Sequence, residues 1–151
     1  MQRRIILSGA ALMLAVALVP STRAADPAAS TLAREPAPKG ARVFFVEPKD
    51  GATVGRDVEV RFGVEGIAIA PAAEGKPGTG HHHLLIDGKA LPPPEAPIPN
   101  DATHKHYGKG QTGDTIQLEP GTHTLQLDFA DARHVQFDPP IVSPKITVHV
   151  K

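Results

Sequence analysis

The feature that most constrains the fold is an alternation of apolar and polar residues that recurs in short segments. In residues 58–64, valine or phenylalanine occupies every second position. Successive side chains of a β-strand point to opposite faces, so this period of two predicts a strand with one buried face. Further strands are predicted at residues 43–46, 81–87, 116–118, 123–129 and 146–150.

Glycine- and proline-rich turns separate these segments, as at Pro48–Gly51, Asp87-Gly88 and Glu119–Thr122. Residues 91–99 are so rich in proline that they cannot join a central ladder, and we expect a surface crossover there. Beyond residue 40, no segment repeats apolar residues at the helical period of 3.6. Short alternating strands joined by such turns are typical of an all-β, two-sheet antiparallel sandwich of immunoglobulin-like or fibronectin-like type.

The N-terminal residues have the pattern of an export signal. Arg3 and Arg4 form a positively charged start, residues 5–19 are almost continuously apolar, and Thr22-Arg23-Ala24 fits the small-x-small cleavage pattern. The apolar run is shorter than the roughly 20 residues of a membrane span. We therefore expect residues 1–24 to be a signal peptide, cleaved after Ala24 or, as second choice, Ala25. The product would be periplasmic or secreted, with no stable membrane anchor.

The charge of the chain argues against nucleic acid as a partner. The full sequence has 16 basic and 16 acidic residues, and the expected signal contains three of the arginines. Cleavage would leave a weakly acidic protein with no basic run to follow a phosphate backbone. The chain has 0 cysteines, and both methionines lie in the expected signal. A Cu(I) site built on thiolate or thioether is therefore not expected.

The rest of the chain divides into a linker and one domain. Residues 25–40 are rich in alanine and proline and lack periodic apolar positions, so we expect a flexible tether. Residues 41–151 remain, and a segment of about 110 residues is a common size for a single hydrophobic core. We expect them to form one histidine-rich β-sandwich domain.

Histidine provides the strongest functional indication, with 8 residues in the chain. The segments 81–83 and 104–106 each contain His-x-His, and residues i and i+2 of a strand share a face. Each pair can therefore present two imidazoles to one ion. We expect about three or four ligands of Cu(II) or Zn(II) to come from one pool. Its members are His81, His83, His104, His106 and His123.

Structural roles also account for some of these histidines. In the run 81–83, either parity can face the core and be satisfied by backbone carbonyls. His123 precedes the apolar stripe of residues 125–129, so it is expected at the rim of the core, where it either caps backbone groups or binds metal. His134 lies in a late loop, where exposure to solvent accounts for it. His149, between two inward valines, is expected to face water.

Several ordered motifs resemble one known family. They are Gly80–Asp87, His104–Thr112 and Pro120–Leu127, flanked by Pro48–Val54 and Ser143–Val148. Together they resemble a bacterial exported family known as domain of unknown function 4399, over residues 43–150. The resemblance implies export and the histidine pattern, and it implies no particular activity.

A more limited resemblance is to the cupins, which are metal-binding β-barrels. Gly75 followed by His81-x-His83 is similar to the start of the first cupin motif, and His123 would belong to the second. The chain departs from the pattern in two ways. Asp87 stands where a glutamate ligand is expected, and the segment before His123 is too short.

Three functions are compatible with this sequence. The first is a non-catalytic metal-binding module, and the second is a metal-dependent enzyme with Asp87 or Asp114 as acid or base. The third is a structural or adhesive domain whose histidines order loops. Cysteine is missing, and Ser30 and Ser143 lie outside the histidine motifs, so no nucleophile is evident. We therefore expect a Cu(II) or Zn(II) binding module rather than an enzyme, with no other cofactor.

Overall fold

The computed structural model describes residues 32–151. The expected signal peptide, residues 1–24, and the first part of the expected tether, residues 25–31, lie outside the described residues. Within the described range, no helix has the length and apolar character needed to cross a membrane.

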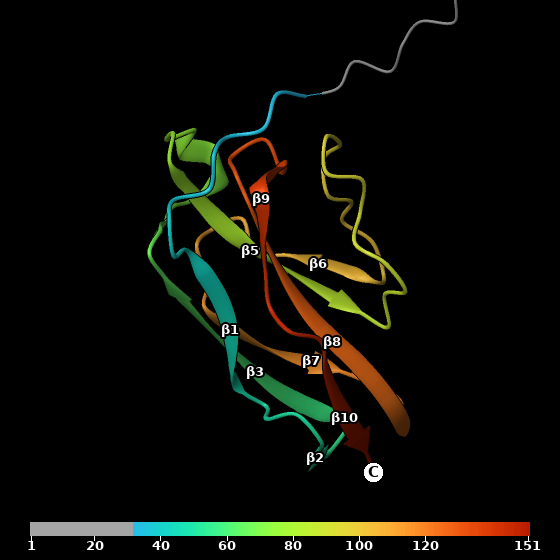
Figure 1. The fold of residues 1–151 in the computed structure, drawn as a ribbon. Helices are drawn as coiled ribbons and strands as arrows, with labels where there is room; N and C mark the ends of the chain where they lie inside the picture. Colours follow the sequence, from blue (N-terminus) through green and yellow to red (C-terminus); the bar gives the residue numbers. More distant parts are fainter. Residues whose placement is uncertain (1–31) are drawn as a thin grey trace, which may run out of the picture. The chain divides into compact units, whose positions relative to one another are not determined.

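The described residues form two β-sheets that enclose a common core, which confirms the predicted all-β sandwich (Figure 1). The smaller sheet has the order β1-β3-β7. Its strands are β1 (Arg42–Glu47), β3 (Asp57–Glu65) and β7 (Gly113–Gln117). All its pairs are antiparallel.

The larger sheet has the order β2-β10-β8-β5-β4, with β6 paired to β5 and β9 paired to β8. Its pairs are antiparallel except β2 with β10 and β4 with β5. A short 3-10 helix, Ala72–Glu74, lies between β4 and β5. The strands of this sheet are β2 (Ala52–Val54), β4 (Ala68–Ile69), β5 (Thr79–Ile86), β6 (His104–His106), β8 (Gly121–Ala130), β9 (Gln136–Val142) and β10 (Ile146–Val150).

The core lies between the two sheets, where the alternating residues meet. Val60 and Phe62 of β3 face Leu127 and Phe129 of β8, and all four are at most 5% exposed. The period of two therefore predicted the inward faces of these strands.

The period of two did not predict β9, which contains Pro139 and Pro140. Proline cannot donate to a ladder, and among the named strands β9 pairs only with β8, as an edge position allows.

Residues 32–40 differ from the flexible tether expected for residues 25–40. The Ala37 amide donates to the Asp138 carbonyl, and the Asp138 amide donates to the Glu35 carbonyl. The Arg34 guanidinium donates to the carbonyls of Gln136 and Phe137. This segment therefore runs along β9 and satisfies its backbone groups. Composition did not reveal this because the contacts are made by main-chain atoms and one arginine.

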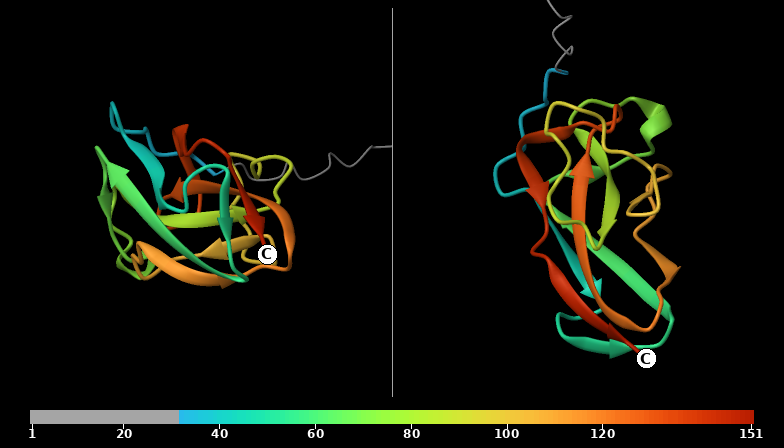
Figure 2. Two further views of the ribbon diagram at one scale, coloured as in Figure 1. Left: turned by 90° about the horizontal axis from the view of Figure 1, so that it is seen from below. Right: turned by 90° about the vertical axis from the view of Figure 1, so that its right-hand side faces the viewer.

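Strand β5 is buried on both faces, which positions the candidate site. Its Leu84 belongs to the core cluster, whereas the neighbouring Leu85, 2% exposed, faces the opposite, outer side. The connection between β5 and β6, coloured yellow in Figure 2, covers this outer side. It is fixed there by the Ile98 amide, which donates to the His134 carbonyl. The predicted surface crossover is thus a cover over the larger sheet.

Candidate metal centre

Three adjacent strands place a row of polar side chains on the outer face of the larger sheet. His83 of β5 lies directly opposite His106 of β6 on one side and Asp128 of β8 on the other. Residues paired in this way project from the same face of the sheet. His81 lies two positions from His83 along β5, so it shares that face. Strand pairing therefore gathers three imidazoles and one carboxyl group.

The turn between β8 and β9 contributes a fourth imidazole, from His134. Its backbone is left-handed, with φ of 65°, a conformation that non-glycine residues adopt uncommonly. The Asp131 carboxylate stabilises this turn by accepting from the amides of Arg133 and Val135 at 2.8 and 3.0 Å. The Arg133 guanidinium also binds Asp131, at 2.6 Å. The turn thus holds a strained backbone that aims the His134 ring at the cluster.

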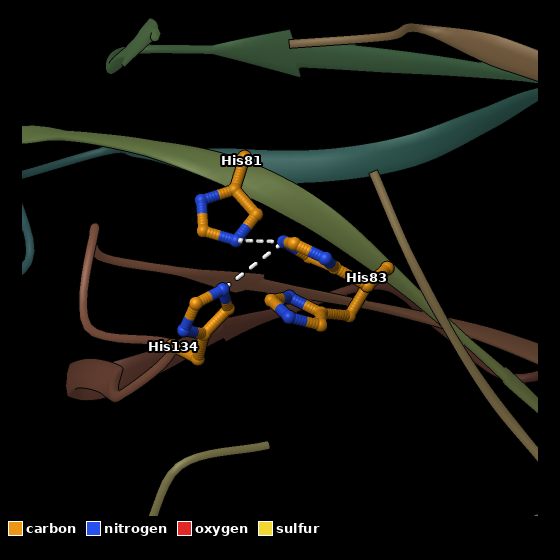
Figure 3. Close-up of side chains that lie close together, drawn as sticks. His81, His83 and His134 are labelled. Carbon is orange, nitrogen blue, oxygen red and sulfur yellow. Dashed lines mark hydrogen bonds between the residues drawn. The ribbon is translucent and has the colours of Figure 1, made fainter. Parts of the chain in front are cut away.

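The ring nitrogens converge (Figure 3). His106 Nε2 lies 3.1 Å from His81 Nε2 and 3.1 Å from His134 Nε2. With His83 included, one nitrogen from each ring lies within 4.8 Å of the other three. We call the set His81, His83, His106 and His134 the four-histidine cluster.

These separations suit a common ion. Zinc binds imidazole nitrogen at about 2.0–2.1 Å, and the corners of a tetrahedron of that size lie about 3.3 Å apart. The two pairs at 3.1 Å are close to that value. The widest separation in the cluster, at most 4.8 Å, would have to shorten by rotation of a side chain. The cluster is therefore near tetrahedral geometry without matching it fully.

Burial favours the uncharged form of His81, His83 and His106. His81 and His83 are 0% exposed, whereas His106 and His134 are half-buried. Burial, together with the nearby rings, lowers the pKa of His81 from 6.5 to about 3 and that of His83 to about 2. The pKa of His106 is lowered in the same direction by burial and by His134. These imidazoles are therefore neutral at pH 7, the form that binds metal.

Several of the buried nitrogens have no hydrogen-bond partner. Both ring nitrogens of His83 and the Nδ1 of His81 are in this state. An unpaired polar atom in the interior costs about 1–3 kcal/mol, so such groups call for a reason beyond packing. A bound ion would satisfy one nitrogen on each ring.

The family relationship follows from sequence comparison. A model described as "domain of unknown function (DUF4399)" matches residues 60–151. The chain belongs to the DUF4399 family. This confirms the resemblance drawn from the motifs. The DUF4399 match includes all of the four-histidine cluster, and β1 and β2 lie before it. No curated protein and no solved structure matches the chain.

The structure brings three of the five predicted residues of this DUF4399 domain together, namely His81, His83 and His106. His104 lies outside the cluster, although it shares a strand with His106. Its Nδ1 is 2.9 Å from Asp101 Oδ1, and the Thr103 hydroxyl is also 2.9 Å away. The ring therefore closes the turn that leads into β6.

His123 also lies outside the cluster, at the rim of the core. Its Nδ1 is 2.8 Å from Asp87 Oδ2, and its Nε2 is 2.8 Å from the Glu119 carbonyl. The hydrogen bond with Asp87 raises the pKa of His123. The ring thus links two turns, which matches the capping role considered for it.

The remaining histidines occupy different environments. His134 joins the cluster, although its loop suggested only exposure to solvent. The sequence did not reveal this because no local pattern connects His134 to residues 81–83. His149 is exposed, as expected. His82 points into the core, where its ring centroid lies 5.2 Å from Phe62 and 5.1 Å from Phe129. Burial lowers the pKa of His82 to about 4.

Proposed function

We propose that this DUF4399 domain is a non-catalytic module that binds one divalent transition-metal ion through the four-histidine cluster. The observation that carries the proposal is the position of His106 Nε2, 3.1 Å from the Nε2 atoms of both His81 and His134. Three ring nitrogens that meet in this way can each turn a lone pair to a shared cation in the appropriate tautomer. The lowered pKa values of His81 and His106 support the proposal, because a neutral ring need not lose a proton to bind.

The ligand set favours Cu(II) or Zn(II). Imidazole suits zinc, copper and nickel, whereas magnesium and calcium prefer oxygen ligands. All four groups in the cluster are imidazoles. The chain has 0 cysteines, so no thiolate competes for the ion.

A binding role is favoured over catalysis by the number of ligands and by the positions of the acids. Four protein ligands fill a tetrahedral shell, whereas catalytic zinc sites keep one position open. Asp87 is bound to His123, and Asp114 is 2.9 Å from the Lys105 ammonium. Both candidate acids are therefore engaged in contacts outside the cluster. The alternative, a purely structural domain, has its own support in His104 and His123, which close turns.

Export to the periplasm or beyond is part of the proposal. It is supported by the signal-like pattern of residues 1–24, with its two arginines, apolar run and small-residue junction. N-terminal sequencing of the protein from the bacterial periplasm tests it, and the expected first residue is Ala25 or Asp26. A product that begins at Met1 in the cytoplasm would contradict it.

Elemental analysis tests the metal-binding role. The untagged protein should retain about one copper or zinc ion per chain after dialysis, and native mass spectrometry should give the same stoichiometry. The double variant His81→Ala/His83→Ala should retain none, whereas His149→Ala should behave as the parent. If the parent protein neither retains nor binds an ion, the metal-binding proposal is wrong and the structural role remains. Hydrolase and oxidase assays of the loaded protein should show no activity.

A further inference from the structure

A buried carboxyl group lies beside the four-histidine cluster and has an unused acceptor. Asp128 is 0% exposed. Its Oδ2 accepts from Gln136 Nε2 at 2.7 Å, whereas its Oδ1 makes no hydrogen bond of good geometry, with the Phe129 amide as a nearby backbone donor. Among residues 32–151 it is the one buried side-chain oxygen in this state.

The nearest complementary group is the imidazole of His83. Asp128 and His83 are directly paired across β8 and β5, so their side chains project side by side, with Cβ atoms about 5 Å apart. Neither ring nitrogen of His83 has a partner. A neutral imidazole has one N–H to donate and one lone pair to share. An unsatisfied acceptor and an unsatisfied donor thus occupy adjacent positions in the interior.

We propose that Asp128 is a positioning residue for His83. When one nitrogen of His83 binds the ion, the other nitrogen donates its N–H to Oδ1 of Asp128 in its deprotonated form. The inference rests on the proposed metal-binding function. Histidine ligands of metals commonly donate to a carboxylate in this way, which fixes the tautomer and the orientation of the ring and makes the metal-binding nitrogen more basic.

The surroundings hold this carboxylate in place. The Gln136 amide that donates to Oδ2 also donates to the Pro92 carbonyl, at 3.3 Å. Pro92 belongs to the connection that covers the outer face of β5. Asp128 is therefore fixed from the side opposite His83, and its free oxygen remains available to the ring.

Two substitutions separate positioning from packing. Asp128→Leu removes both acceptors, whereas Asp128→Asn keeps one oxygen that can accept the His83 N–H. Zinc affinity is measured by competition with a chelator, and the thermal midpoint of each metal-free variant is measured beside it. We expect Asp128→Leu to weaken zinc binding about 10–100-fold and Asp128→Asn to restore most of the loss.

The hydrogen bond itself is observed by NMR of zinc-loaded protein labelled with ¹⁵N-histidine. In the parent, the His83 N–H should be protected from solvent exchange and shifted downfield, and in Asp128→Leu the signal should be lost. This parent measurement decides the matter even if Asp128→Leu fails to fold. Parent affinity in Asp128→Leu, or a rapidly exchanging His83 N–H in the parent, would overturn the inference and leave metal binding intact. A parent that binds no zinc would overturn the proposed function as well.

Discussion

His134 Nε2 lies 3.1 Å from His106 Nε2, although the two residues are 28 positions apart. The contact depends on the left-handed backbone of His134, with φ of 65°. Asparagine tolerates this conformation, so His134→Asn should preserve the turn and remove the ligand. We expect zinc affinity to fall at least about tenfold, as for the loss of a metal-site group. The free energy of unfolding of the metal-free protein should change by less than about 0.5 kcal/mol.

Competition titration and urea unfolding measure these two quantities. His104→Asn is the matched control, because His104 is also half-buried but is bound to Asp101. It should leave zinc affinity unchanged. If His134→Asn bound zinc as the parent does, His134 would not be a ligand.

Gly108 packs against the ring of His106. A Cβ atom at this position would overlap Cε1 and Nε2 of that ring, so Gly108→Ala should displace the ring from the cluster. We expect about a tenfold loss of zinc affinity, since a displaced ligand no longer completes the shell. Gly55→Ala is the control, because a Cβ at Gly55 meets nothing within 4 Å. Parent affinity in Gly108→Ala would show that His106 is not required.

Acid should destabilise the metal-free domain. Burial lowers the pKa values of His81, His82 and His83 to about 3, 4 and 2, whereas in the unfolded chain they lie near 6.5. Between pH 6.5 and 4 the unfolded state therefore binds more protons than the folded state. The stabilisation is fully present above pH 6.5 and is lost as the pH falls, at about 1.4 kcal/mol per pH unit for each proton.

Asp128 acts in the opposite direction across this whole range. Burial raises its pKa from 3.8 to about 7, so the folded state binds the extra proton there and is favoured as the pH falls. His123, whose pKa is raised by Asp87, also opposes the trend near pH 6.5. Three histidines outweigh these groups, so urea unfolding should give a lower free energy at pH 4.5 than at pH 7. Equal stability at both values would contradict burial of the neutral rings.

The side chain of His82 should cost stability. Neither of its ring nitrogens makes a hydrogen bond of good geometry, although backbone groups of Gln111 and Gly63 lie near the ring, which packs between Phe62 and Phe129. Leucine has a similar volume and no polar atoms. We expect His82→Leu to raise the free energy of unfolding at pH 7 by about 1–2 kcal/mol, by removal of buried unpaired groups. It should also reduce the dependence of stability on pH by about one proton. A loss of stability at pH 7 would indicate that the ring makes a needed polar contact.

The alternating pattern predicted the strands with one buried face, such as β3, and it also predicted the inward-facing positions of β8. It was least informative for β5, because both faces of that strand are buried and its residues do not alternate. Either parity of the run 81–83 could have faced the core. Tertiary packing decides the matter: the connection between β5 and β6 covers the outer face, and the His82 ring packs inside between Phe62 and Phe129.

The His-x-His pattern predicted three of the four members of the four-histidine cluster, His81, His83 and His106. It correctly placed His81 and His83 on one face, because the strand period is local. It could not exclude His104, whose ring turns toward Asp101 three residues earlier. It also gave no indication of His134, which reaches the cluster through a turn on another strand. Contacts of this kind depend on tertiary pairing, and no local spacing encodes them.

The adjacent residues His82 and His83 allow the most direct test of metal binding. Both are 0% exposed, but they point to opposite faces of β5. Isothermal titration with Zn(II) and Cu(II) is performed on untagged parent, His82→Leu and His83→Leu proteins at pH 7. We expect one ion per chain for the parent and His82→Leu with equal affinity, and a loss of at least about tenfold for His83→Leu. Equal binding by all three proteins, or weaker binding by His82→Leu alone, would contradict a metal site at the four-histidine cluster.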